Sequence, residues 1–409
     1  SVGAATVMPS GMALIATMFR HPMQRGIAIS LWFSTFMLGM LVGPVLGGIL
    51  LGLFHWGSVF LINLPVMALL LVVAPRVLPE NRGETRAPMD IPSVLLSMVS
   101  VLGVAFSLKE MAALGPSPAR AGVLVLAVAA AVLFVVRQRR LEHPLVDLKL
   151  FLIAPFVVSL VLGVMGGAIQ GGSSYMVNLF VQLVHDKSPI AASVWLLPTV
   201  LAMIVGLMVG PTVAQRVRPG LVISVGLPIA TVGYVVLATV DVDTPLVVTV
   251  IGYATVMFGV GIPMGLGTSI GLGSAGPERA AAASSLTQTC NELGVSLGIA
   301  TLGALGSLVY RTGVESRLPA GVTEEDRSTI GRSLEDADQT ADALPATLGT
   351  QVREASQVAF TDGLSTVAAV AAVTMALLAV LAGVMLRKVD RVAPPGPPPE
   401  ALEELRLYE

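Results

Sequence analysis

The chain has 409 residues, of which 54% are hydrophobic and only 12% are charged, and its mean hydropathy is +0.83. A soluble globular domain usually carries about 25% charged residues, so the composition excludes an ordinary soluble protein. The net charge of −2 and the scattered basic residues give no sign of a nucleic-acid-binding surface. One cysteine, Cys290, and four histidines are too few for a disulfide framework or a cysteine-based zinc site, and the sequence predicts no metal and no cofactor.

Charged or Pro/Gly-rich breaks divide the chain into eleven apolar segments. Most are close to or above the ~20 residues that a helix needs to cross the hydrocarbon core of a bilayer. The pattern therefore predicts an all-α polytopic membrane protein. The predicted helices lie at 1–18, 27–52, 57–75, 91–108, 121–136, 155–183, 189–213, 220–240, 245–272, 280–308 and 360–386.

Basic residues predict the orientation of these helices. Fifteen Lys and Arg side chains lie in one set of alternate loops, and only Lys109, Arg120 and Lys187 lie in the intervening short loops. The positive-inside rule places the first set in the cytoplasm, so we expect a protein of the cytoplasmic (inner) membrane of a bacterium, with a cytoplasmic C-terminus. The hydrophilic segment 311–357 is then external and forms either a short helix or a mobile loop. The proline-rich tail 392–409 is expected to be disordered.

The second apolar segment carries a glycine-rich run, Gly39-Met-Leu-Val-Gly43-Pro44-Val-Leu-Gly47-Gly48. Such a run allows close helix contact and a local bend in a membrane helix. It resembles the antiporter motif of exporters in the major facilitator superfamily. Further stretches resemble the same family in the same order along the chain, at 3–10, 20–25, 55–65, 144–151, 195–198 and at Gln288-Thr289 with Leu293-Gly294.

Taken together, these stretches resemble the 14-helix drug:proton antiporter branch of the family, which includes multidrug and quaternary-ammonium efflux pumps. The resemblance implies a major facilitator fold in which the eleven segments are the family's helices four to fourteen, with helices one to three upstream of Ser1, so that the chain is not expected to transport by itself. The implied divisions are the rest of the N-terminal bundle at 1–76, two inserted linker helices at 77–153, the C-terminal six-helix bundle at 154–391 with an external loop at 311–357, and the tail at 392–409.

Glu292 is the strongest functional signal from the residues themselves. It lies about twelve residues into the segment 280–308, near the predicted bilayer centre, where an acidic side chain costs on the order of 2.5–3.5 kcal/mol. The interiors of the other segments contain no Lys or Arg to pair with it, and apolar surroundings favour the protonated form of an unpaired carboxyl. We predict that Glu292 exchanges a proton or binds a cation; a structural carboxyl, hydrogen-bonded at a helix contact, is the alternative.

Polar residues recur at helical spacing around Glu292, at Ser285, Gln288, Thr289 and Ser296. This stripe predicts a water-accessible cavity or a buried hydrogen-bond network. We expect Gln288 to assist Glu292 in binding either a proton or a cationic drug, and the other three residues to line the cavity. Competition of two cations for one carboxylate is the simplest physical basis for antiport.

Other residues are weaker candidates. Tyr175 and Asn178 could line the cavity or satisfy helix contacts, and Trp195 could stack on a flat cation or belong to an interfacial aromatic belt. Asp362 is predicted to be a solvated cap of the last helix. The glycines between 259 and 273 predict close helix packing.

These features predict a secondary active transporter that exports lipophilic cationic drugs, dyes or quaternary ammonium compounds in exchange for protons. Its partners would be these small molecules, protons and membrane lipids, with no nucleic acid and no obligate protein partner. Some quaternary-ammonium pumps of the branch have an acidic residue in helix ten where this chain has Met203, which favours monovalent over divalent cations.

Two alternatives stay open: a carrier of another solute (a lipid-like molecule, a siderophore or a host-made antibiotic) and a non-transporting membrane receptor or scaffold. An enzyme is not predicted, because the sequence offers no nucleophile–base set, no metal-ligand set and no P-loop.

Overall fold

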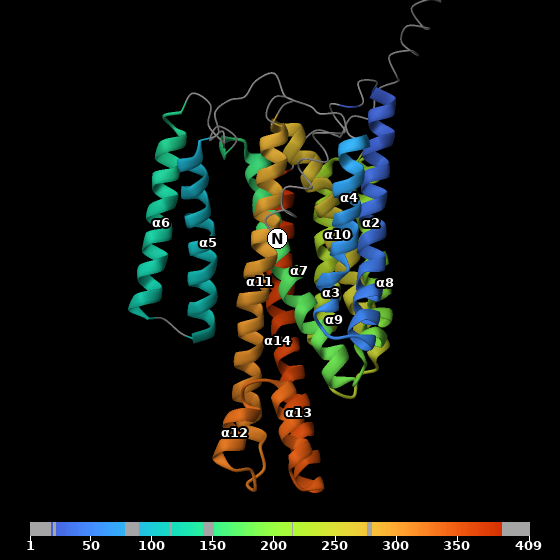
Figure 1. Ribbon diagram of the computed structural model, residues 1–409, viewed down its shortest axis with the longest axis vertical. Coiled ribbons are helices and arrows are strands. Elements are labelled where there is room, and N and C mark those ends of the chain that lie inside the picture. The colour runs from blue at the N-terminus through green and yellow to red at the C-terminus, as the bar shows by residue number, and fades with distance from the viewer. Residues whose placement is uncertain are drawn as a thin grey trace, which may run out of the picture. The chain divides into compact units, whose positions relative to one another are not determined.

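The computed structural model describes residues 18, 22–77, 90–114, 117–141, 151–214, 216–275 and 280–386. Every regular element within these residues is a helix and none is a strand, which confirms the all-α prediction (Figure 1). The chain divides into two compact units. The first contains residues 1–89, 189–197 and 391–409, and the second contains residues 90–188 and 198–390.

The described residues of the first unit form three helices and the start of a fourth. They are α2 (Pro22–Leu53), α3 (Ser58–Leu61), α4 (Asn63–Val77) and residues 189–197 of α8 (Pro189–Ala214). Apart from Met18, the predicted helix 1–18 lies outside the described residues, as do the resemblance at 144–150 and the tail 392–409.

The second unit contains most of the described helices. Its helices are α5 (Ile91–Leu114), α6 (Pro118–Gln138), α7 (Ala154–Leu179), the rest of α8, α9 (Pro219–Ala238), α10 (Leu246–Ala275), α11 (Ala280–Arg317), α12 (Glu324–Ile330), α13 (Leu334–Ala343) and α14 (Ala346–Met385). The end of α7 continues as a π-helix over Phe180–Val184.

The apolar helices agree with the predicted membrane segments. Among the described residues, eight helices are long and apolar enough to cross a membrane, and two shorter apolar stretches lie at Val42–Leu53 and Ile91–Ser107. Together they correspond to the predicted segments from 27–52 to 360–386. The shortest prediction, 121–136, corresponds to a helix of 21 residues because Ser117 caps it and Pro118 occupies its first turn.

Glycines allow α8, α9 and α10 to approach one another closely. A Cβ placed at Gly233 on α9 would lie 2.6 Å from the carbonyl oxygen of Gly252 on α10. A Cβ at Gly261 on α10 would lie 2.6 Å from the carbonyl oxygen of Met203 on α8, and Gly259 contacts α9 in the same way. The predicted close packing is confirmed at Gly259 and Gly261.

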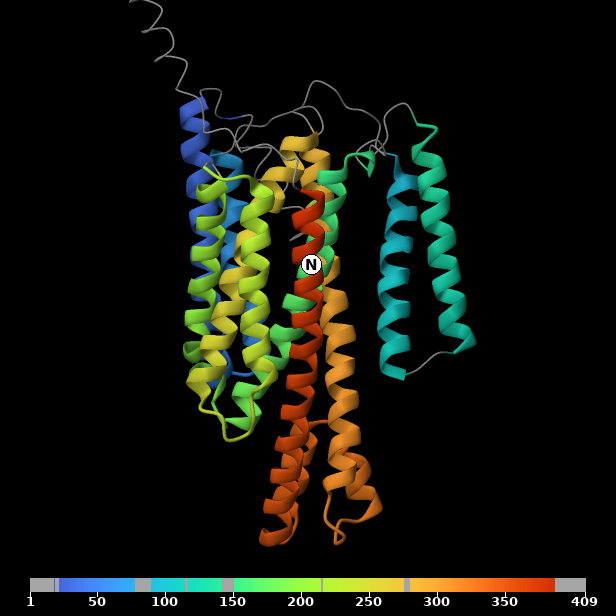
Figure 2. The same ribbon diagram turned by 180° about the vertical axis from the view of Figure 1, so that it is seen from behind.

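The segment between the last two membrane helices is helical. Figures 1 and 2 show α11 and α14 side by side, with α12 and α13 packed at their far end. We call residues 310–357 the lobe. Hydropathy predicts that α11 ends at 308 and that α14 begins at 360, and both limits are wrong, because the two helices continue into the lobe as far as Arg317 and from Ala346. The lobe encloses a small apolar core of Val314, Ile330, Leu334, Ala337 and Val352.

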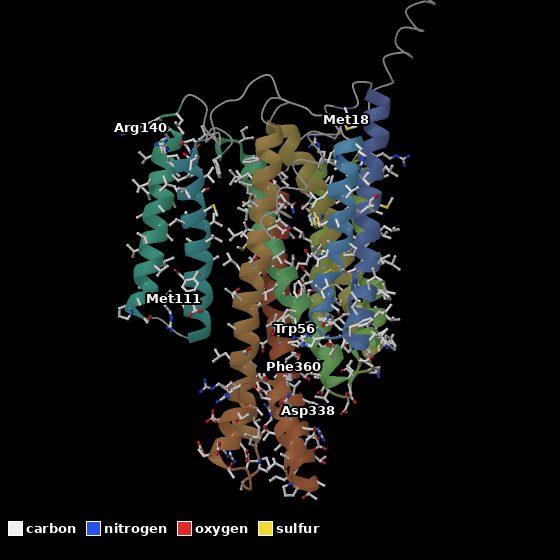
Figure 3. All side chains as sticks on the ribbon, in the orientation of Figure 1. Met18, Trp56, Met111, Arg140, Asp338 and Phe360 are labelled. Carbon is white, nitrogen blue, oxygen red and sulfur yellow. The ribbon has the colours of Figure 1, made fainter. Side chains whose placement is uncertain are left out.

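Side-chain caps fix the short helices of the lobe. Thr323 accepts a hydrogen bond from the backbone nitrogen of Asp326 at 3.2 Å, and its hydroxyl donates to the Asp326 carboxylate at 2.7 Å. Ser333 makes the same two bonds with Asp336. Acidic residues in the first turn also complement the helix dipole. Figure 3 shows nitrogen and oxygen atoms gathered around α12 and α13, near the labelled Asp338.

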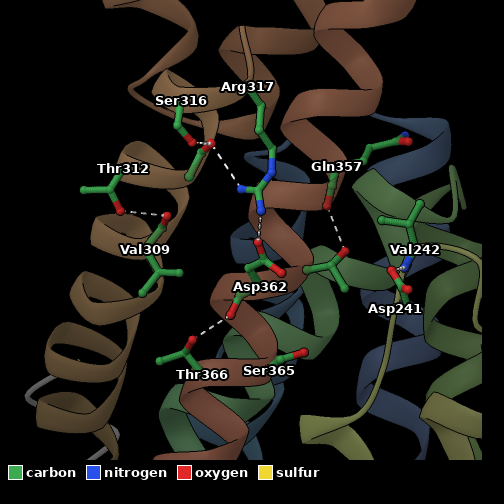
Figure 4. A network of polar contacts seen from close by, with 12 residues as sticks. Asp241, Val242, Val309, Thr312, Ser316, Arg317, Gln357, Asp362, Ser365 and Thr366 are labelled. Atoms are coloured by element: carbon green, nitrogen blue, oxygen red, sulfur yellow. Dashed lines mark hydrogen bonds and ion pairs between the residues drawn. The ribbon is translucent and has the colours of Figure 1, made fainter.

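Asp362 does not cap the last helix, so that prediction is wrong. It lies well inside α14, which begins at Ala346, and its carboxylate pairs with Arg317 Nη2 on α11 at 2.8 Å (Figure 4). Hydropathy placed the start of this helix too late, so that an interior residue looked like a terminal one.

Candidate functional site

A cavity of about 70 Å³ lies within the second unit. It is lined by residues of α7, α9, α10, α11 and α14. This volume accommodates a few water molecules and is well below the ~300 Å³ of the smallest typical ligand pockets. Its apolar lining comes from Leu162, Leu227, Val260, Pro263, Met264, Met375 and Leu378, and its polar lining from Ser159, Gln170, Thr287, Gln288 and Asn291.

Helix α7 supplies one wall of the cavity through residues at helical spacing. Ser159, Gly163, Gly166 and Gln170 recur every three or four residues and therefore share one face. The buried Ser159 hydroxyl donates to the carbonyl oxygen of Phe156 at 2.7 Å. The Gln170 amide donates to the sulfur of Met203 on α8 at 3.6 Å, a weak bond that holds the amide beside a polarizable, uncharged partner.

Helix α11 supplies a neighbouring wall, and its polar residues reach the cavity through close backbone contact with α7. A Cβ at Gly167 of α7 would lie 2.6 Å from the carbonyl oxygen of Asn291. A Cβ at Gly171 would lie 2.5 Å from the carbonyl oxygen of Val295, one turn further along α11. Because these glycines have no side chains, the backbones meet, and Asn291 is placed at the cavity edge.

The predicted pair Gln288 and Glu292 is brought together. The Gln288 amide nitrogen Nε2 donates to Glu292 Oε1 at 3.0 Å, across one turn of α11. Gln288 also lines the cavity, whereas Glu292 does not and has an exposed side chain. Gln288 therefore contacts both the cavity and the carboxylate.

The other predicted cavity residues do not line this cavity. Thr289 and Ser296 are exposed on α11, and the Ser285 side chain lies outside the described residues. Tyr175 and Asn178 are exposed near the end of α7, where Asn178 accepts a hydrogen bond from Gln182. Trp195 belongs to the first unit and is also exposed.

Sequence reasoning missed Ser159, Thr287 and Asn291 as cavity residues. Asn291 is a polar residue in an apolar helix and lies three positions after Gln288, so a signal was present. The predicted stripe was centred on Glu292 instead, because periodicity within one helix does not say which face the neighbouring helices cover.

The glycine-rich motif of α2 makes close contact at its C-terminal end. A Cβ at Gly48 would lie 2.8 Å from Ser193 Oγ and 3.0 Å from the Ile190 Cα, both at the start of α8. At Gly39, Gly43 and Gly47, which precede it along α2, a Cβ would meet no described atom within 4 Å. Pro44 lies inside the helix.

The chain is similar to several curated bacterial proteins. It is 32% identical over 385 residues to the multidrug efflux pump LfrA of Mycolicibacterium smegmatis, covering 94% of this chain and 76% of that protein. It is 28% identical to the methyl viologen resistance protein SmvA of Salmonella typhimurium, covering 96% and 79% of the two chains. It is 30% identical to the tetracenomycin C resistance and export protein of Streptomyces glaucescens, covering 94% and 73%.

A solved structure and a family model also match the chain. The fold is similar to that of a bacterial homologue of the human lysosomal transporter Spinster, in an inward-facing and occupied conformation. The TM-score is 0.52 at 16% identity, over 95% of this chain and 76% of the other. Residues 1–299 match the model of the Major Facilitator Superfamily. The chain belongs to the Major Facilitator Superfamily.

Proposed function

We propose that the protein is a secondary active exporter of drug-like molecules that exchanges lipophilic cations for protons. The observation that carries the proposal is the position of Gln288, which lines the cavity and donates to the Glu292 carboxylate at 3.0 Å. Through this residue, the protonation of Glu292 can influence a solute that contacts the cavity lining, once the cavity widens beyond the few water molecules that its present volume accommodates.

The amide of Gln288 supplies a physical basis for exchange. An ionised Glu292 accepts the bond from Nε2, which leaves the amide oxygen of Gln288 for other partners. A protonated Glu292 can donate to that oxygen if the amide turns over, and the amide then presents its NH₂ group instead. An oxygen attracts a cation and an NH₂ group repels one, so protonation and cation binding oppose each other.

The uncharged lining of the cavity supports a preference for monovalent cations. Its polar groups are hydroxyls and amides, and Met203 beside Gln170 is neutral. One relative is named for resistance to methyl viologen, a doubly charged compound, so the charge of the solute is a point to measure. Efflux of a mono-quaternary and a bis-quaternary compound, driven by the same proton gradient in vesicles, distinguishes the two classes.

A second candidate is export of a neutral antibiotic. Amides and hydroxyls bind carbonyl and hydroxyl groups as readily as they bind a cation, and another relative is named as an export protein for tetracenomycin C. Such a carrier would still fail when a protonophore collapses the gradient, but cationic dyes would not compete with its solute.

We also propose the arrangement in the membrane. The basic loops favour a multi-pass protein of the bacterial inner membrane, with a cytoplasmic C-terminus and the lobe outside. We further propose that the chain belongs to a 14-helix carrier. In that carrier, residues 1–76 are part of the N-terminal helix bundle, residues 77–153 contain the two inserted linker helices, and residues 154–391 form the C-terminal bundle.

The deciding experiment measures proton movement in vesicles that contain the full-length protein. Adding a cationic solute should release protons with the unchanged protein, and Glu292→Gln should abolish the release. Glu315→Gln serves as a matched control, because Glu315 is an exposed carboxylate on the same helix, in the lobe. Unchanged proton release in Glu292→Gln would rule out the proposed role of Glu292.

A further inference from the structure

Two buried hydroxyl groups on α10 have no hydrogen-bond partner within the described part of the chain. The side chain of Tyr253 is 3% exposed and that of Thr249 is fully buried, yet neither Tyr253 OH nor Thr249 Oγ1 bonds to a described donor or acceptor. An unpaired buried hydroxyl costs free energy, and a buried group of this kind in a native protein is normally paired with protein or with water. Thr249 and Tyr253 are four residues apart and therefore share one face of α10.

The Thr249 hydroxyl lacks the bond that a helical Thr usually makes. Such a Thr donates to the carbonyl four residues earlier, as Thr255 does to Ile251 at 2.9 Å. The carbonyl four residues before Thr249 belongs to Pro245 and accepts from the backbone nitrogen of Val248 at 2.9 Å, but Thr249 Oγ1 does not bond to it. The Thr249 hydroxyl is free to bind something else.

A second buried pair lies next to Tyr253. Ser173 on α7 donates to the carbonyl oxygen of Ile169 at 2.6 Å, so Tyr234 on α9 donates to Ser173 Oγ at 2.8 Å. Ser173 and Ser174 face the Tyr253 hydroxyl, although neither bonds to it directly. Three helices thus bring hydroxyl groups to one place in the bundle.

This cluster continues the faces that line the cavity. On α7, Ser173 follows the cavity residue Gln170 by one turn, and on α9, Tyr234 follows Leu227 by two turns. On α10, Tyr253 precedes Val260 by two turns. The polar lining therefore extends beyond the cavity towards the end of the bundle where α10 begins.

We propose that Tyr253, Thr249, Ser173 and Tyr234 form an internal water-binding site that extends the hydration of the cavity along α10. A buried water typically makes about three hydrogen bonds, and the Tyr253, Thr249 and serine hydroxyls supply that number. The site does not depend on the proposed proton exchange, because it follows from burial and hydrogen bonding alone.

Radiolytic labelling with short X-ray pulses tests the site in the full-length protein in lipid nanodiscs. Hydroxyl radicals formed from a bound water oxidise the side chain beside it, even when that side chain is inaccessible to bulk solvent. Each labelling rate is divided by the intrinsic reactivity of its residue type. We expect Tyr253 to be labelled several-fold faster than Phe156, which is fully buried in an apolar cluster with Leu160 and Leu286. A Tyr253 rate no higher than that of Phe156 overturns the proposal.

A matched pair of tyrosines supplies the second measurement. Tyr310 is also 3% exposed, but its hydroxyl donates to the carbonyl oxygens of Ile330 and Ser333. Tyr253→Phe should lower the melting temperature if the hydroxyl binds water and should raise it if the hydroxyl is dry, whereas Tyr310→Phe lowers it in either case. A higher melting temperature in Tyr253→Phe therefore overturns the proposal.

Substitution of Thr249 tests whether the two hydroxyls share the water. Thr249→Val should slow the labelling of Tyr253, and Thr249→Ser, which keeps the hydroxyl, should restore it. If Thr249→Val folds as judged by its melting curve and Tyr253 is labelled at the original rate, the shared site is refuted.

Discussion

Arg317 on α11 and Asp362 on α14 form an ion pair with a distance of 2.8 Å between Nη2 and Oδ2. A second guanidinium nitrogen of Arg317, Nη1, donates to the carbonyl oxygen of Gly313 at 3.1 Å (Figure 4). The pair joins the two helices at the point where they enter the lobe. Both side chains are close to half exposed, so water competes for the same charges.

The Arg317–Asp362 pair is expected to contribute little to stability. Exposed ion pairs are worth about 0.2–1 kcal/mol in double-mutant cycles, and salt screens them further. Arg317→Gln, Asp362→Asn and the double variant should therefore give a coupling energy within that range in thermal or chemical unfolding, and it should decrease at high salt. A coupling that is larger and insensitive to salt would show that the pair is shielded from water.

The glycines between α7 and α11 are expected to tolerate no side chain. At Gly298 a Cβ would overlap the carbonyl oxygen of Ala168, a backbone atom that cannot rotate away. Gly298→Ala should destabilise the protein by about 1–3 kcal/mol or more, measured by the melting temperature in detergent.

Gly303→Ala is the matched control on the same helix, because its Cβ would lie 3.7 Å from the Tyr175 ring, an ordinary contact. At Gly303, alanine lowers the backbone entropy of the unfolded chain. The substitution should therefore leave the free energy of unfolding unchanged or raise it by up to about 1 kcal/mol. Equal effects of the two substitutions would contradict the backbone contact.

The α5–α6 pair is expected to lose stability in acid through Asp90. Its carboxylate accepts bonds from Arg137 and Ser93, and the Arg137 hydrogen bond is the main cause that lowers the Asp90 pKa from 3.8 to about 2. Because the folded pKa is lower than the unfolded one, the stabilisation is complete above pH 3.8 and is lost as the pH falls towards 2.

Melting curves at a series of pH values check this prediction. Asp90→Asn should melt at a lower temperature than the unchanged protein at pH 6, and the difference should vanish as the pH approaches 2. A constant difference over that range would exclude Asp90 as the titrating group. Glu110→Gln serves as the control, because Glu110 Oε2 and Arg120 Nε are 3.9 Å apart, which makes this ion pair longer than the 2.7 Å pair of Asp90 and Arg137.

The lobe is expected to depend on the Tyr310 hydroxyl. This group donates to Ile330 at 2.9 Å and Ser333 at 3.1 Å, at the joint between α12 and α13. Tyr310→Phe leaves these carbonyl oxygens without their donor, at a cost of about 1–3 kcal/mol. The rate of amide hydrogen exchange should rise in α12 and α13 and remain unchanged in α9. Unchanged exchange rates in α12 and α13 as well would show that water replaces the hydroxyl.

Hydropathy was sufficient to predict the membrane helices, because each membrane helix must form all of its backbone hydrogen bonds within one apolar segment. It failed at the end of α11 and the start of α14. There the two helices extend beyond the predicted apolar segments and are stabilised by the burial of Val314 and Val352. The capping patterns at Thr323 and Ser333 indicate the starts of two short helices from the sequence. Hydropathy alone does not detect them, because both helices are polar.

The candidate site could be predicted only in part. The pairing of Gln288 with Glu292 follows from helical spacing, because the residues are one turn apart. The roles of Asn291 and Ser159 depend on how α11 and α7 are rotated about their axes, which is set by Gly167, Gly171 and Gly298 meeting backbone atoms of the facing helix. Contacts across such sequence separations are not contained in the pattern of one helix.

The same glycine contacts have a mechanical consequence. Side chains can change rotamer to let two helices slide, but backbone atoms in direct contact, as at Gly294 with Val164 and Gly298 with Ala168, have no such freedom. α7 and α11 should therefore move as a single stiff rod in any conformational cycle. A displacement at the Glu292 end of that rod would reach Gln170 without loss, so these two walls of the cavity would shift together relative to α9, α10 and α14, which supply the rest of its lining.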